Sequence, residues 1–131
     1  VQNTLTGKIS KNQPYIFNIC HLGQMAQIKG VGIEFAFEVS SLIFGGVENW
    51  NSDENLSNAA KKVGLDLIQL RESVTVHEEK IIEQIKQNQV DQLNAGHHGV
   101  PLTVIGDKYF FGQDQFEKIM ETLKENGLKE R

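Results

Sequence analysis

Cysteine is nearly absent from this chain of 131 residues, since Cys20 is the only one. A single cysteine excludes an intrachain disulfide, a Cys-x-x-Cys redox pair and a multi-cysteine zinc site within this sequence. The scarcity of cysteine favours a reducing compartment, and we predict a cytoplasmic protein. Cys20 falls on an apolar helical stripe with Ile16 and Ile19, and because free cysteines are mostly buried, we expect it in the core.

Proline, basic clusters and long apolar runs are also scarce. Only two prolines occur and 39% of the residues are hydrophobic, a composition that excludes wholesale disorder. The apolar stretch over residues 39–47 is interrupted by serines and glycines and is far too short to cross a bilayer. The net charge is −4 and the lysines are scattered, so we expect neither a nucleic-acid nor a membrane partner.

Helical periodicity dominates residues 15–95 of the sequence. Apolar residues recur every three to four positions over residues 15–28 and again over residues 33–44, which predicts two amphipathic helices. Two further helices are predicted from their N-caps. Ser52 or Asp53 can cap the first of them, and Asp66 can cap the second. Residues 1–14 show no sustained period, and we interpret them as a mobile lead-in. The length of the chain suits one domain of ordinary size.

Two places have the spacing of a capping box, in which two side chains bond to each other's free backbone amides. Thr75 and Glu78 have this spacing, and they predict a long helix over residues 76–95 with a narrow apolar stripe. Asp114 and Glu117 repeat it before the last apolar-periodic segment, which predicts a C-terminal helix.

A different pattern separates these two helices. Residues 102–105 and 108–111 are short β-favouring runs, and they flank the dipeptide Gly106-Asp107, which is typical of a tight hairpin turn. An isolated two-stranded hairpin is marginally stable in water. We therefore expect that the hairpin packs entirely on helices, or that its neighbouring strands lie upstream of Val1 or on another subunit.

The hairpin region resembles the C-terminal part of DsbA-like thioredoxin-fold proteins. The resemblance rests on Gly99-Val100-Pro101 and on Phe110-Phe111-Gly112-Gln113-Asp114. The branch that it most resembles contains the 2-hydroxychromene-2-carboxylate isomerases and the kappa-class glutathione transferases, whose inserted helical subdomain is similar to residues 43–51 and 59–66. The resemblance covers about residues 20–127.

This resemblance implies an α/β fold that is a partial thioredoxin-like domain. It would consist of the lead-in over residues 1–14, a mostly helical insertion subdomain over residues 15–95, and a β-hairpin with a C-terminal helix over residues 96–131. In the family a preceding β-α-β unit carries the nucleophile, either a cysteine or a serine that activates glutathione. No residue of this chain matches that position, so we expect the intact protein to be an enzyme and this chain alone to be inactive.

The resemblance also implies a thiol-binding site. In the family the proline of this motif follows a cis peptide bond, and the backbone before it pairs with the cysteinyl group of a bound thiol, which places these roles on Val100 and Pro101. The alternative is a trans-proline at the start of a strand. Gln113 and Asp114 match the polar pair that holds the γ-glutamyl end of glutathione, whereas Gln115 replaces the family's usual arginine. The alternative is that Asp114 only caps the last helix.

His98 and Trp50 complete the predicted substrate site. His98 precedes the proline loop and would line the pocket, and Trp50 would close it from the helical subdomain. The alternative for Trp50 is packing at a helix end, and for His97 a structural role in the loop. An adjacent pair of histidines with no further ligand at suitable spacing is a poor metal site, so we expect none.

The main hypothesis is therefore that this chain is part of a glutathione-dependent isomerase or transferase, which acts on glutathione and an unknown second substrate. One alternative is a protein disulfide oxidoreductase of the DsbA family. The other is a non-catalytic binding or assembly module, in which the hairpin edge pairs with a partner strand. The oligomeric state is left open, with a homodimer as one option.

Overall fold

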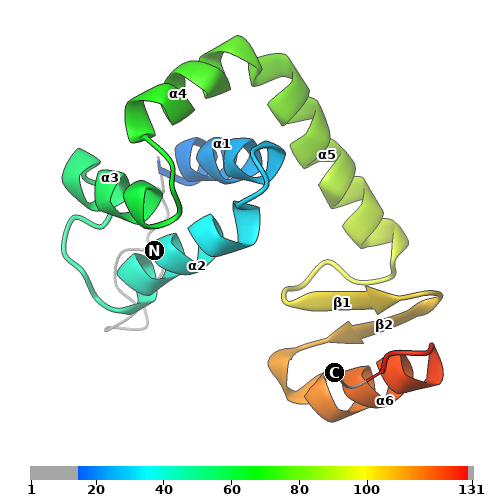
Figure 1. Ribbon diagram of the computed structural model, residues 1–131. Helices are drawn as coiled ribbons and strands as arrows, with labels where there is room; N and C mark the ends of the chain where they lie inside the picture. Colours follow the sequence, from blue (N-terminus) through cyan, green and yellow to red (C-terminus); the bar gives the residue numbers. More distant parts are fainter. Residues whose placement is uncertain (1–14, 130–131) are drawn as a thin grey trace. The chain divides into compact units, whose positions relative to one another are not determined.

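The computed structural model describes residues 15–129, so the predicted lead-in lies outside the described residues. In the described part, five helices are followed by a β-hairpin, a short 3₁₀ turn and a last helix. Figure 1 shows how these elements follow one another along the chain. Their bounds are α1 (Tyr15–Ile28), α2 (Gly32–Phe44), α3 (Asp53–Lys62), α4 (Leu67–Val76), α5 (Glu78–Asn94), β1 (Leu102–Ile105), β2 (Lys108–Phe111), η2 (Gln113–Gln115) and α6 (Phe116–Glu125). None of the helices in this range is both long and apolar enough to span a membrane.

The chain forms two compact units, of which one ends at Glu83 and the other begins at Gln84, inside α5. We call their described residues the helical unit (15–83) and the hairpin unit (84–129). The sequence predicted a boundary at residues 95 and 96, between a helical subdomain and a β-β-α unit. That boundary came from the family resemblance, which a division into compact units does not test, so it stays a prediction.

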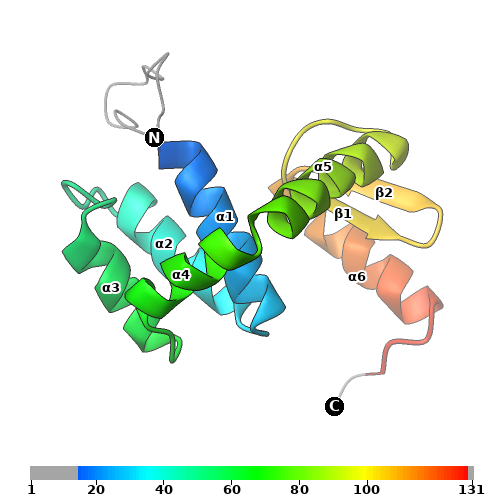
Figure 2. The same cartoon turned by 90° about the horizontal axis from the view of Figure 1, so that it is seen from above.

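The helical unit has a closed apolar core. Helix α1 packs against α2 and α4, and α3 packs against the same two helices (Figure 2). Each of these four helices contributes two or three buried residues, all of them apolar, to this core. The largest fully enclosed side chains of the unit are Phe35, Leu22, Leu56, Leu70 and Ile81.

Two predicted N-caps of the helical unit are confirmed. The backbone N–H of Asn55 donates to the Ser52 hydroxyl at the start of α3. The backbone N–H of Gln69 donates to a carboxylate oxygen of Asp66, at 2.9 Å, at the start of α4. Each cap supplies an acceptor to an amide that has no partner within its helix.

The capping box predicted at Thr75 is wrong. Thr75 lies inside α4, and its hydroxyl donates back to the carbonyl of Arg71 at 3.1 Å. The helix that Asp66 starts runs on through Val76, and the break comes at His77, whose backbone N–H bonds to carbonyls of α4. A threonine inside a helix bonds to the preceding turn, so it is no longer available as a cap.

The prediction that Cys20 packs in the core is also wrong, because Cys20 is exposed. The buried residues of α1 are Leu22, Met25 and Ala26. Residues of an α-helix are rotated by about 100° from one to the next, so Cys20 lies on the side opposite to these three. Helix α1 is apolar on more than one side, and its sequence alone does not say which side meets α2 and α4.

The hairpin unit contains the predicted strands with the predicted turn. Strands β1 and β2 pair antiparallel, with Leu102 opposite Phe111 and Ile105 opposite Lys108. The capping role predicted for Asp114 is wrong, since no side chain caps α6. Asp114 lies in η2, which moves the first residue of α6 to Phe116 and leaves the carboxylate too early in the chain to cap it.

Candidate functional site

The hairpin has two faces, which its register defines. Residues directly opposite each other in an antiparallel pair point to the same side of the sheet. We name each face after the group that lies against it, which is His97 on one side and helix α6 on the other. The histidine face consists of Leu102, Val104, Tyr109 and Phe111, and the helix face consists of Thr103, Ile105, Lys108 and Phe110.

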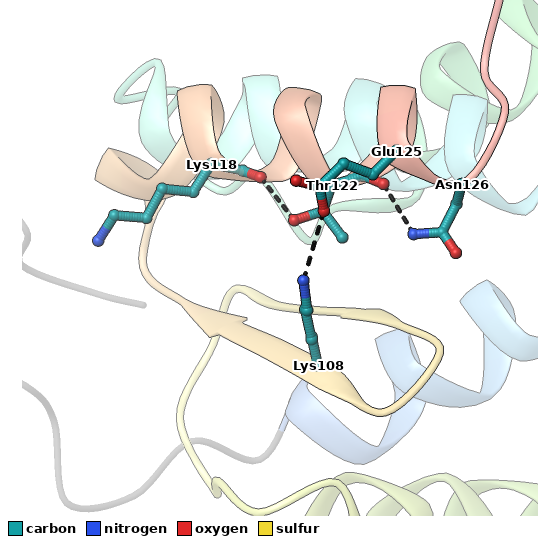
Figure 3. A network of polar contacts seen from close by, with 5 residues as sticks. All are labelled: Lys108, Lys118, Thr122, Glu125 and Asn126. Carbon is teal, nitrogen blue, oxygen red and sulfur yellow. Dashed lines mark hydrogen bonds and ion pairs between the residues drawn. The ribbon is translucent and has the colours of Figure 1, made fainter.

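Helix α6 covers the helix face. Figure 3 shows Lys108 of β2 reaching toward Glu125 of α6, where its Nζ lies 3.5 Å from a carboxylate oxygen. Thr122 and Asn126 instead bond back to carbonyls of α6 itself, at 2.9 and 2.8 Å. Both partners of the ion pair are exposed, and such pairs contribute little stability, so this ion pair adds little to the attachment of α6.

Four of the predicted binding residues lie at one end of the hairpin, namely Val100, Pro101, Gln113 and Asp114. The backbone N–H of Gly112 donates to the carbonyl of Pro101 at 3.1 Å, which brings the segments before β1 and after β2 together. The peptide bond between Val100 and Pro101 is cis, as the resemblance implied. Val100 is 77% exposed.

The carboxylate of Asp114 lies at this same end. Gly112 has φ 102°, a left-handed value that suits glycine. A Cβ on residue 112 would lie 2.6 Å from Oδ1 of Asp114, so the glycine also leaves room for the carboxylate. Gln113 and Asp114 are both exposed. The site thus combines the exposed residue Val100 with an exposed amide and carboxylate after β2.

His97 holds the loop that leads into this site. Its Nδ1 accepts the backbone N–H of Gly99 at 2.8 Å, and its ring stacks on Phe111 with centroids 3.9 Å apart. The side chain of Gln92 donates to the carbonyl of Gly99 at 3.0 Å. A Cβ on residue 99 would collide with the rings of Phe111 and His97, so this loop conformation requires glycine. These contacts agree with the structural role in the loop that was the alternative for His97.

His98 and Trp50 have different surroundings. His98 is exposed, and its ring stacks on that of His97 with centroids 5.1 Å apart. Trp50 is buried in the helical unit and meets Tyr15 edge-on at 5.8 Å, which fits the packing alternative. The indole N–H of Trp50 is buried without a hydrogen-bond partner. The predicted roles of both residues in substrate binding stay predictions.

Cys20 is the one thiol among residues 15–129. Desolvation raises the pKa of the Cys20 thiol, which keeps it protonated near neutral pH and makes it a poor nucleophile. That stretch of chain holds no group of three or more His, Cys, Asp or Glu side chains placed to bind a metal ion.

Comparison with protein families identifies the architecture. The family model of the DSBA-like thioredoxin domain matches residues 20–124, which is most of the chain. The chain belongs to the DsbA-like thioredoxin-domain family. This confirms the family part of the resemblance, and membership in this DsbA-like family indicates thiol-disulfide oxidoreductase or isomerase chemistry. Neither the search of curated proteins nor the search of solved structures found a significant match.

Membership in the DsbA-like family also accounts for the mixture of elements. A helical region followed by a hairpin and one helix is consistent with part of a thioredoxin-like α/β fold. In the described residues the sheet has two strands, β1 and β2. The assignment to the isomerase and glutathione transferase branch is finer than this match and stays a prediction.

Proposed function

We propose that this chain is the thiol-binding portion of a DsbA-like enzyme, and that it holds glutathione at the end of the hairpin where Val100 and Asp114 lie. The observation that carries the proposal is the meeting of these residues through the bond from Gly112 to Pro101. The backbone of the exposed Val100 would offer a donor and an acceptor to the cysteinyl part of an extended thiol. The carboxylate of Asp114 offers an ion pair to the γ-glutamyl amino group.

The reaction that follows from this proposal is isomerisation or conjugation, with the glutathione thiolate as the attacking group and a second substrate that the chain does not identify. The nucleophile or activating serine of the family has no counterpart in this sequence, so the proposal includes that the chain alone binds and does not catalyse. Disulfide exchange of the DsbA type is the second candidate, because the family match supports a thiol site without choosing between these reactions. A cytoplasmic location is part of the proposal.

The test is the affinity of the chain for reduced glutathione, measured by calorimetry with the Asp114→Asn variant. We expect the unmodified chain to bind, and the variant to bind about fivefold more weakly, because the loss of one exposed charge pair costs about 1 kcal/mol.

Asp107→Asn is the matched control, since Asp107 is an exposed carboxylate in the turn at the opposite end of the hairpin. It makes the same change of charge and is expected to leave the affinity unchanged. An equal loss in both variants would show that only the net charge matters, and it would contradict the proposed site. S-methylglutathione distinguishes the thiol from the γ-glutamyl end, because it retains the amino group and blocks the sulfur.

A further inference from the structure

Glycine follows asparagine at one place in the sequence, Asn126-Gly127. Such a pair can react within the chain, because glycine has no side chain that would hinder its backbone nitrogen from attacking the amide carbon of the asparagine. The reaction requires water and no enzyme. Both residues lie at the end of α6 and are exposed to solvent.

The end of α6 is closed by a Schellman motif. Asn126 is the C-cap of the helix, and Gly127 follows it with φ 93°, a left-handed value. The backbone N–H of Gly127 donates to the carbonyl of Lys124 at 3.0 Å. The N–H of Leu128 donates to the carbonyl of Leu123 at 2.9 Å. These bonds satisfy carbonyls that have no partner within the helix, and the left-handed turn that they need favours glycine.

The side chain of Asn126 is bonded back to the same helix. Its Nδ2 donates to the carbonyl of Thr122 at 2.8 Å, a bond that Figure 3 shows. The same carbonyl accepts the backbone N–H of Asn126 at 3.0 Å. Both groups that would react are thus engaged in the folded chain, since the amide of Asn126 and the N–H of Gly127 each donate to a carbonyl of α6.

We propose that Asn126 is a site of spontaneous deamidation, and that the last turn of α6 controls the rate. When the turn opens, the backbone nitrogen of Gly127 loses its proton and attacks Cγ of Asn126. A Cγ–N bond forms and the Cγ–Nδ2 bond breaks, so that Nδ2 leaves as ammonia with that proton and a cyclic succinimide remains. Water then opens the ring at either carbonyl, which gives aspartate or isoaspartate.

The rate depends on how often the two restraining bonds are broken together. Helix ends open locally more easily than the parts of a helix that are packed in a core. The reaction is therefore slow and not absent in the folded chain. An unfolded chain has neither bond, so unfolding should accelerate the reaction.

Either product weakens the end of α6. Aspartate replaces Nδ2 by a carboxylate oxygen, which cannot donate to the carbonyl of Thr122. Its negative charge also lies at the C-terminus of a helix, where the aligned peptide dipoles disfavour it. Isoaspartate adds one methylene group to the main chain, so that the amides of Gly127 and Leu128 no longer match their acceptors. The reaction thus converts a closed helix end into a looser one.

Peptide mass spectrometry tests the site. Trypsin cleaves after Lys124 and Lys129, and the peptide 125–129 contains no asparagine other than Asn126. The chain is kept at mildly alkaline pH in buffer and in concentrated guanidinium chloride. We expect the mass gain of an amide that becomes an acid in both, at least about tenfold faster in guanidinium chloride, where the bonds of the turn are lost. Equal rates would overturn the role of the fold, and no gain in guanidinium chloride would overturn the site.

Asn126→Gln is the matched control for the chemistry. Glutamine keeps a side-chain amide, but the backbone nitrogen of Gly127 would have to close a larger ring. The peptide of this variant is expected to keep its mass in both solutions. An equal mass gain in this variant would show direct hydrolysis of the amide and would contradict the cyclic intermediate.

The effect on α6 is tested with Asn126→Asp, which is one of the two products. Hydrogen exchange at the Leu128 amide should become about fivefold faster, because the carboxylate loosens the turn that holds this amide. Asn94→Asp is the matched control, since Asn94 is the last residue of α5 and takes the same change of charge at another helix end. It is expected to leave the Leu128 amide unchanged. An unchanged rate in Asn126→Asp, or equal acceleration in both variants, would overturn the effect on α6.

Discussion

The helical unit and the hairpin unit differ in how much of their apolar surface they bury. The helical unit encloses Phe35, Leu22 and Ile81 almost completely. In the hairpin unit Thr122 is the only buried residue of the described part, while Phe116 and Val100 are 67% and 77% exposed. The helical unit is therefore stabilised by its own core, whereas most apolar residues of the hairpin unit are partly or largely exposed. Binding is expected where these groups remain open.

The largest predicted effect is on the free energy of unfolding, and it tests the core of the helical unit. Phe35→Ala removes a ring that is 1% exposed and is expected to lower the free energy of unfolding by about 3 to 5 kcal/mol. Phe37→Ala, in the same helix, removes a ring that is 68% exposed and should change it by less than about 0.5 kcal/mol. Urea unfolding followed by Trp50 fluorescence measures both. Similar losses would contradict a closed core.

The sequence predicted elements well where the signal was local. Ser52, Asp66 and the turn at Gly106-Asp107 act through neighbouring backbone groups, and each was located correctly. The failures required tertiary information. Thr75 had a correct spacing inside a helix that continued past it, and Cys20 was on an apolar side of α1 that faces away from α2 and α4.

Only part of the candidate site was predicted, because some of its contacts also depend on tertiary structure. The residues of the motif were found by resemblance, and the bond from Gly112 to Pro101 shows how the fold gathers them. The ring of His97, which accepts the Gly99 N–H, is stacked on Phe111 at the end of β2, the partner strand of the hairpin. No local pattern in the sequence reports that contact.

A middle-sized effect concerns the loop before Pro101. His97→Ala removes the acceptor for the Gly99 N–H and the ring that covers Phe111, at an expected cost of about 1 kcal/mol to the local structure. Hydrogen exchange at the Gly99 amide should become about fivefold faster. His98→Ala removes an exposed imidazole from the same loop and should leave this amide unchanged. Equal acceleration in both variants would contradict the specific role of His97.

The smallest effect is a pH dependence in the helical unit. The hydrogen bond and charge of Arg71 hold the pKa of Asp53 below its usual value, with 2.7 Å between the two groups. Because the folded pKa is the lower one, this pair adds stability above the unfolded pKa, and that stability is lost as the pH falls through the folded pKa.

The corresponding variant is Asp53→Asn. It should melt slightly earlier than the unmodified chain at pH 7, and the difference should vanish in strong acid. Glu54→Gln removes an acidic charge from the same first turn of α3 and leaves the Arg71 pair intact. Identical pH profiles for the two variants would mean that the helix end, and not Arg71, determines the effect.

The most direct test of the thiol site is a residue-resolved titration of the ¹⁵N-labelled chain with reduced glutathione. The account predicts that amide resonances of Val100, Gly112 and Asp114 move together along one binding curve, while those of the helical unit, such as Phe35 and Leu56, stay in place. Shifts confined to the helical unit, or no saturable shift at Val100 and Asp114, would contradict a thiol site at this end of the hairpin.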